Sequence, residues 1–499
     1  MRRLRFDISI SLTAQLALST PTSERGFNTP YPAIHWLNND ILLSVFNSYR
    51  LDDEDDWNLR LPMGWCKLSH VCQRWRHLIY ACAFHLGMRI KCTNGTPKLE
   101  TLDHLPSLPL VIDYKHRHPK RGVNLTEQEE LGMYHALWLR ERVYHIDLEL
   151  PPSILHKVLV LLNGQFPILE RLSLSFSPTS ENSIPLALPK AFLAPNLRRL
   201  SLPEISPPRR LQVLTSTCSL VQLVLNNIQT SSYFRPRLLV ARLSSLPLLE
   251  ELCIEFSIPI PRPSAESELL GENRAPVMLP SLKKLQFKGV GAYLESLAAQ
   301  IRAPLLEWLK ITLFNQIAFA LPHLSYLINA TEAFKRKHRC AAIDFSPDGV
   351  YLTINQPIPP IYDSPQRGSF SLRVICESLN WKIHSVTQIC HEIIPTLCYV
   401  EQLLLCYSYY DKIATELRNR AIDSAMWHDL LRSFVEVQSL SMYQLMLEKE
   451  ISRALRVDEV GSDPGFLPNL QSIHAKRRLF TRFIDTRRVV GRHVEFVKW

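Results

Sequence analysis

Six segments of the chain repeat one pattern of apolar and polar residues, usually a Pro, one further residue and then Leu-x-x-Leu-x-Leu. The leading leucines of the copies are Leu169, Leu197, Leu220, Leu249, Leu282 and Leu306. Apolar residues two apart point the same way from a β-strand, so Leu172 and Leu174 should enter a core while Arg171, Ser173 and Ser175 face outward. Each copy therefore predicts one short strand that is buried on one side.

The copies follow one another at intervals of 23 to 33 residues, close to the period of leucine-rich repeats. Stacked units of this kind form a curved parallel sheet on the inside and helices or irregular segments outside. The fold class we expect is therefore α/β, an irregular leucine-rich-repeat solenoid. The repeats should be irregular because the position that usually carries Asn or Cys in the turn holds Ser177, Ile205, Ile228, Ser257, Val290 and Phe314.

Weaker copies continue the pattern at 321–329, 399–406, 434–442 and 467–475. Between 340 and 376, three strand-like segments precede a helical one, so we expect the solenoid to continue without a break. Stretches rich in Pro, Ser or charge predict loops at 177–190, 259–280 and 356–368. A basic helix and a short strand at 476–499 should close the last core layer.

The region before the repeats has helical periodicity. The first helix places apolar residues at Leu37, Ile41, Leu42, Val45 and Phe46, and the second at Leu68, Val71, Cys72, Trp75, Leu78, Ile79 and Cys82. Asn38, Asn39 and Asp40 can each cap the first helix, since a short polar side chain can accept from an unpaired backbone N–H. Further on, Thr126 and Glu129 form a capping box for a helix whose predicted apolar side carries Leu131, Tyr134, Leu137 and Trp138.

Two short helices bury too little surface to be stable alone. Either they dock on the rest of the chain or they offer an apolar face to a partner, and periodicity alone leaves both readings open. The segment resembles an F-box, which opens Leu-Pro-x-Glu-Ile-Leu-x-x-Ile-Phe and continues Trp-x-x-Leu-x-x-Val-Cys-x-x-Trp-Arg. The matching stretches are 37–46 and 65–76, with Asn38 in the place of the usual Pro and Asp40 in that of the Glu.

The resemblance extends along most of the chain. HLGMRIKCTNGTP, PLVIDY, the repeats, GVYLTI and a closing strand that ends in Trp are similar to a large group of mushroom-type fungal F-box proteins. Membership implies the substrate-recognition subunit of an SCF-type ubiquitin ligase. A Skp-family adaptor, and through it a cullin, would be bound or supported by Leu37, Ile41, Leu42, Phe46, Leu68, Val71, Trp75 and Ile79. The repeats would hold a target protein.

Composition agrees with an intracellular chain of more than one domain. With 499 residues and 46% hydrophobic content, it divides into a leader at 1–30, an F-box-like domain at 31–85, the solenoid at 86–475 and a terminal cap at 476–499. The 11 cysteines are scattered, as expected in a reducing compartment, so we expect a cytoplasmic or nuclear location. No apolar run has the length of a membrane span.

The net charge of +10 raises the question of nucleic acid. Seven basic residues between Lys476 and Arg492 face a single acid, Asp485. A phosphate-tracking groove needs basic residues spread along one face, so a solvated helix face explains this segment better. Nucleic-acid binding through the tail remains a third hypothesis. A scaffold without ligase activity, whose hairpin only caps the solenoid, is the second.

The sequence offers no catalytic constellation. Gly is scarce, at 15 of 499, and no phosphate loop or nucleophile motif occurs. Cys66, His70, Cys72 and His77 crowd together without the two ligand pairs of a zinc site. We therefore expect no enzyme activity, no cofactor and no metal.

A recognition surface remains, formed by the outward residues of the predicted strands. The candidate target-binding residues are Glu251, Glu255, Lys284, Lys288, Trp308 and Lys310. On one reading the charges pair across strands and keep the sheet soluble. On the other, the lysines and Trp308 form an anchor patch, because Trp is frequent at interface hot spots. The sequence favours neither.

Overall fold

A computed structural model describes most of the chain. The described residues are 37–54, 66–82, 86–94, 102, 107–115, 125–176, 186–207, 209–259, 275–316, 318–334, 340–354, 368–393, 397–407, 423–455, 466–476 and 479–498. The predicted leader and most of the predicted loops lie outside these ranges. The chain forms two compact units, the first from residues 1–113 and 125–136, the second from 114–124 and 137–499.

The first unit contains the predicted helical hairpin. Its elements are α2 (Asn39–Glu54), α3 (Cys66–Ser69), α4 (Gln73–Ala81) and the parallel strands β1 (Ile90–Cys92) and β2 (Leu110–Lys115). The predicted cap of the first helix is confirmed, because the side chain of Asn38 accepts from the backbone N–H of Asp40 at 3.3 Å. α2 and α4 pack through Phe46 and Trp75, whose rings meet edge to face at 4.8 Å.

The second helix was predicted as continuous, and this prediction is wrong. The chain leaves helical geometry between α3 and α4, and Cys72 becomes the N-cap of α4 with an extended backbone. Its Sγ accepts from the N–H of Trp75 at 3.5 Å. Because the break re-aims the preceding residues, Val71 is exposed while Trp75 and Ile79 stay buried.

The next helix, α6 (Glu127–Trp138), begins with the predicted capping box. The N–H of Thr126 donates to Glu129 Oε2 at 2.8 Å, and the N–H of Glu129 donates back to Thr126 Oγ1 at 3.3 Å. The predicted apolar side is confirmed only at Leu137, which is buried. Leu131 and Trp138 are exposed, and Met133 and Ala136 are buried instead. Trp138 is the last residue of the helix, where a bulky side chain can leave the core.

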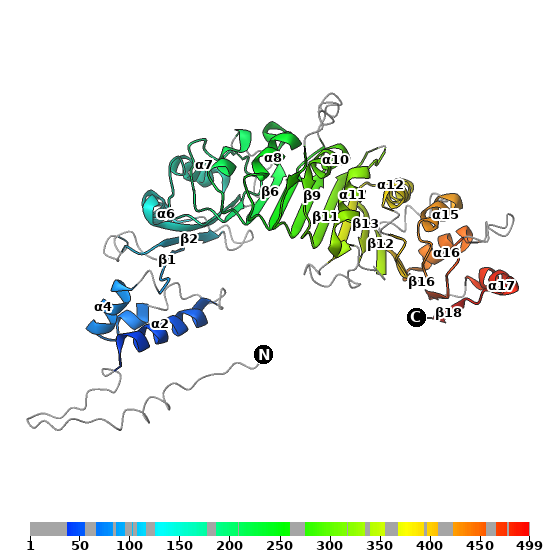
Figure 1. Ribbon diagram of the computed structural model, residues 1–499, viewed down its shortest axis with the longest axis horizontal. Coiled ribbons are helices and arrows are strands. Elements are labelled where there is room, and N and C mark those ends of the chain that lie inside the picture. Colours follow the sequence, from blue (N-terminus) through cyan, green and yellow to red (C-terminus); the bar gives the residue numbers. More distant parts are fainter. Residues whose placement is uncertain are drawn as a thin grey trace, which may run out of the picture. The chain divides into compact units, whose positions relative to one another are not determined.

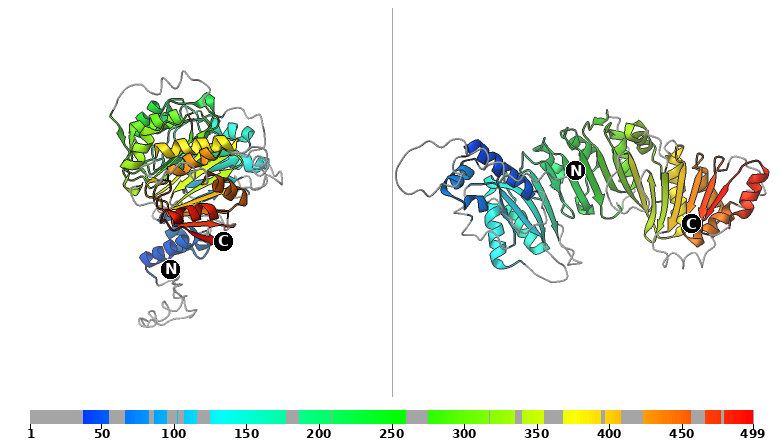
Figure 2. Two further views of the ribbon diagram at one scale, coloured as in Figure 1. Left: turned by 90° about the vertical axis from the view of Figure 1, so that its right-hand side faces the viewer. Right: turned by 90° about the horizontal axis from the view of Figure 1, so that it is seen from below.

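The second unit is a row of strands with helices along one side, as Figures 1 and 2 show. The order of its strands is β3-β4-β5-β6-β7-β9-β11-β14-β13-β12-β15-β16-β17-β18. The strand bounds are β3 Val143–Leu150, β4 Arg171–Phe176, β5 Arg199–Ser201, β6 Gln222–Ile228, β7 Glu251–Phe256, β9 Lys284–Gly289, β11 Trp308–Phe314, β12 Cys340–Ser346, β13 Gly349–Ile354, β14 Ser369–Ile375, β15 Gln402–Tyr407, β16 Ser439–Met442, β17 Ser472–Ala475 and β18 Glu495–Lys498. A separate pair is formed by β8 (Val277–Met278) and β10 (Ile301–Arg302).

Helices and short 3-10 turns connect these strands. Their bounds are α7 Pro152–Leu161, α8 Pro236–Leu243, α10 Gly291–Gln300, α11 Pro322–Ala330, α12 Leu379–Glu392, α15 Ser424–Arg432, α16 Leu445–Ala454 and α17 Thr481–Val489, with 3-10 turns at Arg140–Arg142, Arg209–Thr215, Thr230–Ser232 and Glu332–Phe334. The protein is thus an irregular α/β leucine-rich-repeat solenoid, as predicted.

The repeat leucines form the core. The six leading leucines are at most 1% exposed, and Leu172 and Leu174 are fully buried. Parallel pairing aligns equivalent positions, so that Leu172 lies beside Leu200 and Leu252 beside Leu285. Outward residues of the same strands are half-buried, which is the alternation that the sequence predicts.

The solenoid does not continue without a break. β12, β13 and β14 form an antiparallel meander that runs backward along the row, so that β14 joins β11 and β12 joins β15. α12 then carries the chain past the meander to β15. The three strands were predictable from their alternation, but their reversed order was not. The weak copy at 321–329 is also wrong, because these residues form α11.

Side chains other than an Asn ladder satisfy the turns. The amides of Asn196 and Asn469 and the hydroxyl of Ser281, each directly before a leading apolar residue, donate to the carbonyls of Pro167, Val435 and Pro247 one repeat earlier. Their distances are 2.7 Å, 3.5 Å and 2.8 Å. The hydrogen bonds that connect neighbouring repeats are therefore made just before each strand, and not at the turn position where the usual repeat carries Asn.

Candidate functional site

The eight candidate adaptor residues separate into a core group and a surface group. Buried within the hairpin are Leu37, Leu42, Phe46, Trp75 and Ile79, while Leu68 is half-buried. Ile41 and Val71 are 47% and 55% exposed. The buried five can therefore position a contact surface, whereas Ile41 and Val71 can touch a partner directly.

A third exposed apolar residue, Tyr80 on α4, is 38% exposed and was missed by the sequence reasoning. It follows the buried Ile79, so strict helical periodicity would have placed it at the edge of the apolar face. Ile41, Val71 and Tyr80 are named the hairpin surface below.

Arg74 fixes the start of α2 to α4. Its Nη2 donates to the carbonyl of Leu37 at 2.6 Å and to Asn39 Oδ1 at 2.8 Å. Asn38 lies between these two acceptors and caps α2 itself. The residue that departs from the F-box pattern is thus part of an ordered helix start, because the cap and the arginine together hold the backbone on both sides of it.

The six candidate target-binding residues lie on three adjacent strands, β7, β9 and β11. Glu251, Lys284 and Trp308 share one register level of the sheet, and Cys253, Gln286 and Lys310 share the next. Glu255 and Lys288 share the level after that, with Thr312 on β11. All six candidates are half-buried on the outward side of the sheet, and we call this surface the strand face.

Several charges on the strand face are already paired. Glu251 forms the predicted ion pair with Lys284 and also accepts from Gln222 Nε2 at 2.8 Å. Glu255 accepts from Gln286 Nε2 at 2.6 Å instead of pairing with Lys288. Lys288 places its Nζ 5.8 Å from the centre of the Phe314 ring. The solubilising reading therefore accounts for Glu251, Lys284 and Glu255.

Cys253 lies two strands from Lys310 at the same level. Its Sγ donates to Asn226 Oδ1 at 3.0 Å. Burial raises the pKa of the Cys253 thiol to about 12, Glu255 adds to the rise, and Lys310 opposes it. The thiol is therefore neutral at physiological pH and supplies no counter-charge to the lysine.

The strand face continues onto the meander, which the sequence reasoning did not include. Arg373 on β14 is paired with Asp348, and its guanidinium lies 4.8 Å from the centre of the Tyr351 ring. The pKa of Asp348 is lowered, first by a hydrogen bond from Ser346 and then by Arg373. The reversed strand order places β14 and its Arg373 beside β11, with Tyr351 on the next strand, β13, so no linear repeat pattern could have found them.

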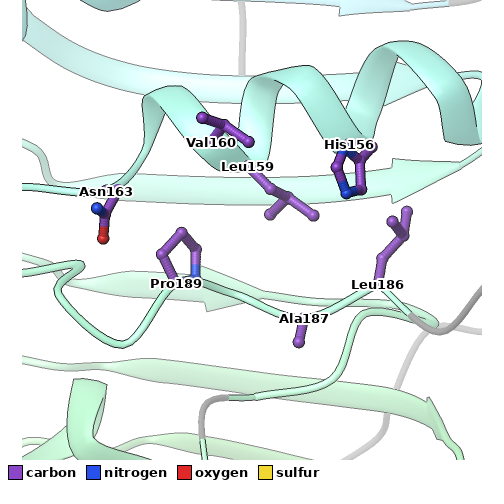
Figure 3. A pocket seen from close by; sticks show the side chains of 7 residues that line it. All are labelled: His156, Leu159, Val160, Asn163, Leu186, Ala187 and Pro189. Atoms are coloured by element: carbon purple, nitrogen blue, oxygen red, sulfur yellow. The ribbon is translucent and has the colours of Figure 1, made fainter.

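A pocket of about 360 Å³ opens between α7 and the segment 186–189. Figure 3 shows its lining residues, His156, Leu159, Val160, Asn163, Leu186, Ala187 and Pro189. Leu159 and Leu186 are buried, whereas His156, Val160 and Asn163 are exposed. Its polar groups are few, so the pocket has no constellation for bond chemistry.

None of the helices in the described ranges combines the length and the apolar character that crossing a lipid bilayer requires. In the same ranges, no three His, Cys, Asp or Glu side chains are arranged to hold a metal ion.

Comparison with known proteins yields distant structural similarity. No protein-family model matches the chain, and no curated protein matches it. The chain is similar to a TLR13–ssRNA13 complex, with 12% identity and a TM-score of 0.29, over 78% of this chain and 45% of that one. It is also similar to the leucine-rich repeat-containing protein LegL7 from Legionella pneumophila, with 12% identity and a TM-score of 0.25, over 81% and 98%. The match thus spans less than half of the TLR13 chain.

Proposed function

We propose that the protein is the substrate-recognition subunit of an SCF-type ubiquitin ligase. The hairpin binds a Skp-family adaptor, and through it a cullin, while the strand face binds a target protein. The observation that carries the proposal is the hairpin surface: three large apolar side chains stay exposed on a hairpin whose F-box-like core residues are buried. A partner that covers these side chains would remove their apolar surface from water, which favours binding.

The chain performs no bond chemistry in this proposal. It raises the effective concentration of a target near the ubiquitin-transferring enzyme, and the gain depends on both surfaces being occupied at once. The strand face supports a binding role because its outward residues mix an aromatic side chain with charges, a combination typical of interface anchors.

The test is affinity purification of the full chain with the proteasome blocked. Ile41→Asp and Val71→Asp should remove a Skp-family adaptor from the retained proteins, because a buried carboxylate at the contact costs several kcal/mol. Both positions are exposed in the free chain, so the fold should survive. Val489→Asp is the matched control, since Val489 is 88% exposed on α17, far along the sequence from the hairpin. Undiminished adaptor retention by folded Ile41→Asp and folded Val71→Asp would overturn the adaptor contact through the hairpin surface, and absence of any adaptor from the wild-type sample would overturn the ligase role.

Leu42→Asp serves a different purpose. Leu42 is fully buried, so the substitution should disrupt the hairpin core and the adaptor contact together. Loss of adaptor by Leu42→Asp alone, with Ile41→Asp and Val71→Asp unaffected, would indicate that the folded hairpin binds the adaptor through residues other than the hairpin surface.

A further inference from the structure

Lys310 has no counter-ion among the described residues. It projects from the middle of β11 on the strand face and is half-buried. Its neighbours at the same level are Gln286 on β9 and Ser371 on β14, both uncharged. Along its own strand, Thr312 is 8% exposed. A half-buried ammonium with neutral neighbours is open to an anionic partner, because a charge-assisted hydrogen bond is stronger than a neutral one.

The nearby carboxylates are engaged elsewhere. Glu251 binds Lys284 and Gln222, and Glu255 accepts from Gln286. On the other side, Asp348 is paired with Arg373. Each acid of the strand face therefore has its own partner, whereas Lys310 has only the neutral thiol of Cys253 near it.

Trp308 lies beside Lys310 on the same strand and the same side. Residues two apart on a strand are separated by about 6.6 Å. A partner segment in extended conformation has the same spacing between alternate side chains, so one of them can meet the ammonium while the next covers the indole. Lys288 lies on the neighbouring strand β9, two residues beyond Gln286, and adds a second positive charge near Lys310.

A single carboxylate fits this surface better than a phosphate. Phosphate is bound most effectively by several converging donors, typically arginine forks. The strand face offers flexible lysines, and Glu251 and Glu255 lie on β7, two strands from β11, where they would repel a dianion. A monoanion that reaches Lys310 from the β11 side avoids this repulsion.

We propose that the Trp308–Lys310 segment of the strand face binds an extended segment of a partner protein in which Asp or Glu alternates with apolar side chains. This inference rests on the proposed target-binding role and names the chemistry of the target. It also resolves the two readings of the surface: Lys284 belongs to the paired, solubilising charges, and Lys310 belongs to the anchor.

The test uses the full chain and fluorescein-labelled peptides that alternate Asp and Leu. Matched peptides carry Asn or phosphoserine in place of every Asp. Fluorescence anisotropy at physiological ionic strength should show binding of the Asp peptide, with the Asn and phosphoserine peptides at least about tenfold weaker. Equal binding of the Asn peptide, tighter binding of the phosphoserine peptide, or no binding of the Asp peptide would each overturn the inference.

Matched variants locate the site. Lys310→Met keeps the length of the side chain and removes the charge, and it should weaken binding of the Asp peptide at least about tenfold. Lys310→Arg should retain most of the affinity. Lys283→Met is the control, because Lys283 lies directly before β9 and is paired with Glu250 at 3.1 Å. If Lys283→Met and Lys310→Met weaken binding equally, the effect is one of net charge and the inference fails.

Adaptor retention, measured on the same variants, keeps the two proposals separate. Lys310→Met should retain the Skp-family adaptor while losing acidic-segment binding. If the wild-type chain retains no adaptor yet binds the Asp peptide through Lys310, the ligase proposal fails and the acidic-segment site stands.

Discussion

The side-chain amide of Gln444 bonds both backbone groups of Tyr407. Its Oε1 accepts from the N–H of Tyr407 at 3.1 Å, and its Nε2 donates to the carbonyl at 3.0 Å. Tyr407 ends β15, and Gln444 stands two residues beyond the end of β16. Gln316, two residues beyond β11, similarly accepts from the N–H of Gly291 at 3.0 Å. Glutamine thus connects neighbouring turns in repeats that lack the usual Asn of the turn.

Gln444→Ala should lower the free energy of unfolding by about 1–3 kcal/mol, because it leaves two buried backbone groups of Tyr407 without partners. Gln471→Ala is the control at an exposed glutamine, where a change within about 0.5 kcal/mol is expected. Urea denaturation of the two variants measures the difference. Equal stability of the two variants would show that water replaces the amide at no cost.

Truncation of two adjacent residues should change the stability of the hairpin by very different amounts. Leu42→Ala removes a fully buried side chain and should cost about 2–5 kcal/mol of hairpin stability, whereas Ile41→Ala, at a 47% exposed position, should cost well under 1 kcal/mol. Hydrogen exchange of the amides in α2 and α4 reports local opening. Faster exchange should appear only in Leu42→Ala, and its appearance in Ile41→Ala would place Ile41 in the core.

The core of the solenoid was predictable because each repeat carries its own signal: every leading leucine is buried, and local alternation alone decides which side it faces. The strand order of the meander was not predictable, because alternation within each strand does not say which strand pairs with which, and β14 rather than β12 pairs with β11. The helix break at Cys72 was missed for a related reason. Apolar spacing continues through it, while the cap that interrupts it depends on a thiol accepting from Trp75.

The meander offers a sharp test at Gly349. A Cβ at this position would lie 2.3 Å from the carbonyl oxygen of Val374, a backbone atom that cannot rotate away. Gly349→Ala should therefore destabilise the chain by at least about 1–3 kcal/mol through displacement of β13 from β14. Gly132→Ala is the opposite control, because nothing lies within 4 Å of its Cβ and Ala favours a helix by about 0.5–1 kcal/mol. Thermal unfolding should move down for the first and stay or rise for the second.

Glu295 gives a prediction for pH. It is 7% exposed and accepts from the N–H groups of His323 and Leu324 at 2.8 Å and 2.9 Å, so it caps α11 from α10. Burial raises the pKa of its carboxyl, the two backbone bonds and His323 oppose the rise, and Glu392 adds to it. The folded state therefore binds a proton more readily than the unfolded chain. This contribution to stability is present below the unfolded pKa and is lost as the pH rises through the folded one.

The stability of wild type relative to Glu295→Gln should accordingly be greater at acidic pH than at neutral pH. At either pH the variant should be less stable, because an amide can accept with one oxygen only and its NH₂ would face a second donor, at a cost of about 1–3 kcal/mol. Denaturant unfolding at both pH values measures the difference. A difference that grows toward neutral pH would contradict the raised pKa.

Some features of the candidate sites depend only on one strand, whereas others depend on how the strands are assembled. Trp308 and Lys310 could be placed on the strand face from alternation, because two residues on one strand need no tertiary information. The pairing of the surrounding charges could not be predicted from alternation. Glu255 accepts from Gln286 and does not pair with Lys288, and the pairing of Arg373 with Asp348 depends on the meander. Which cation remains unpaired is a property of the assembled surface.

The thiols should react in the order of their burial and pKa. Cys218 is exposed, whereas burial raises the pKa of Cys376 to about 11 and that of Cys253 to about 12. The thiolate is the form that reacts, so the raised pKa keeps Cys253 almost entirely in the unreactive thiol form at pH 8. Iodoacetamide at this pH, followed by peptide mass spectrometry, should label Cys218 first and leave Cys253 and Cys376 until the chain is denatured. Lys310→Met removes the one nearby charge that favours the Cys253 thiolate, so it should slow labelling of Cys253 further; faster labelling would mean that the substitution has opened the strand face.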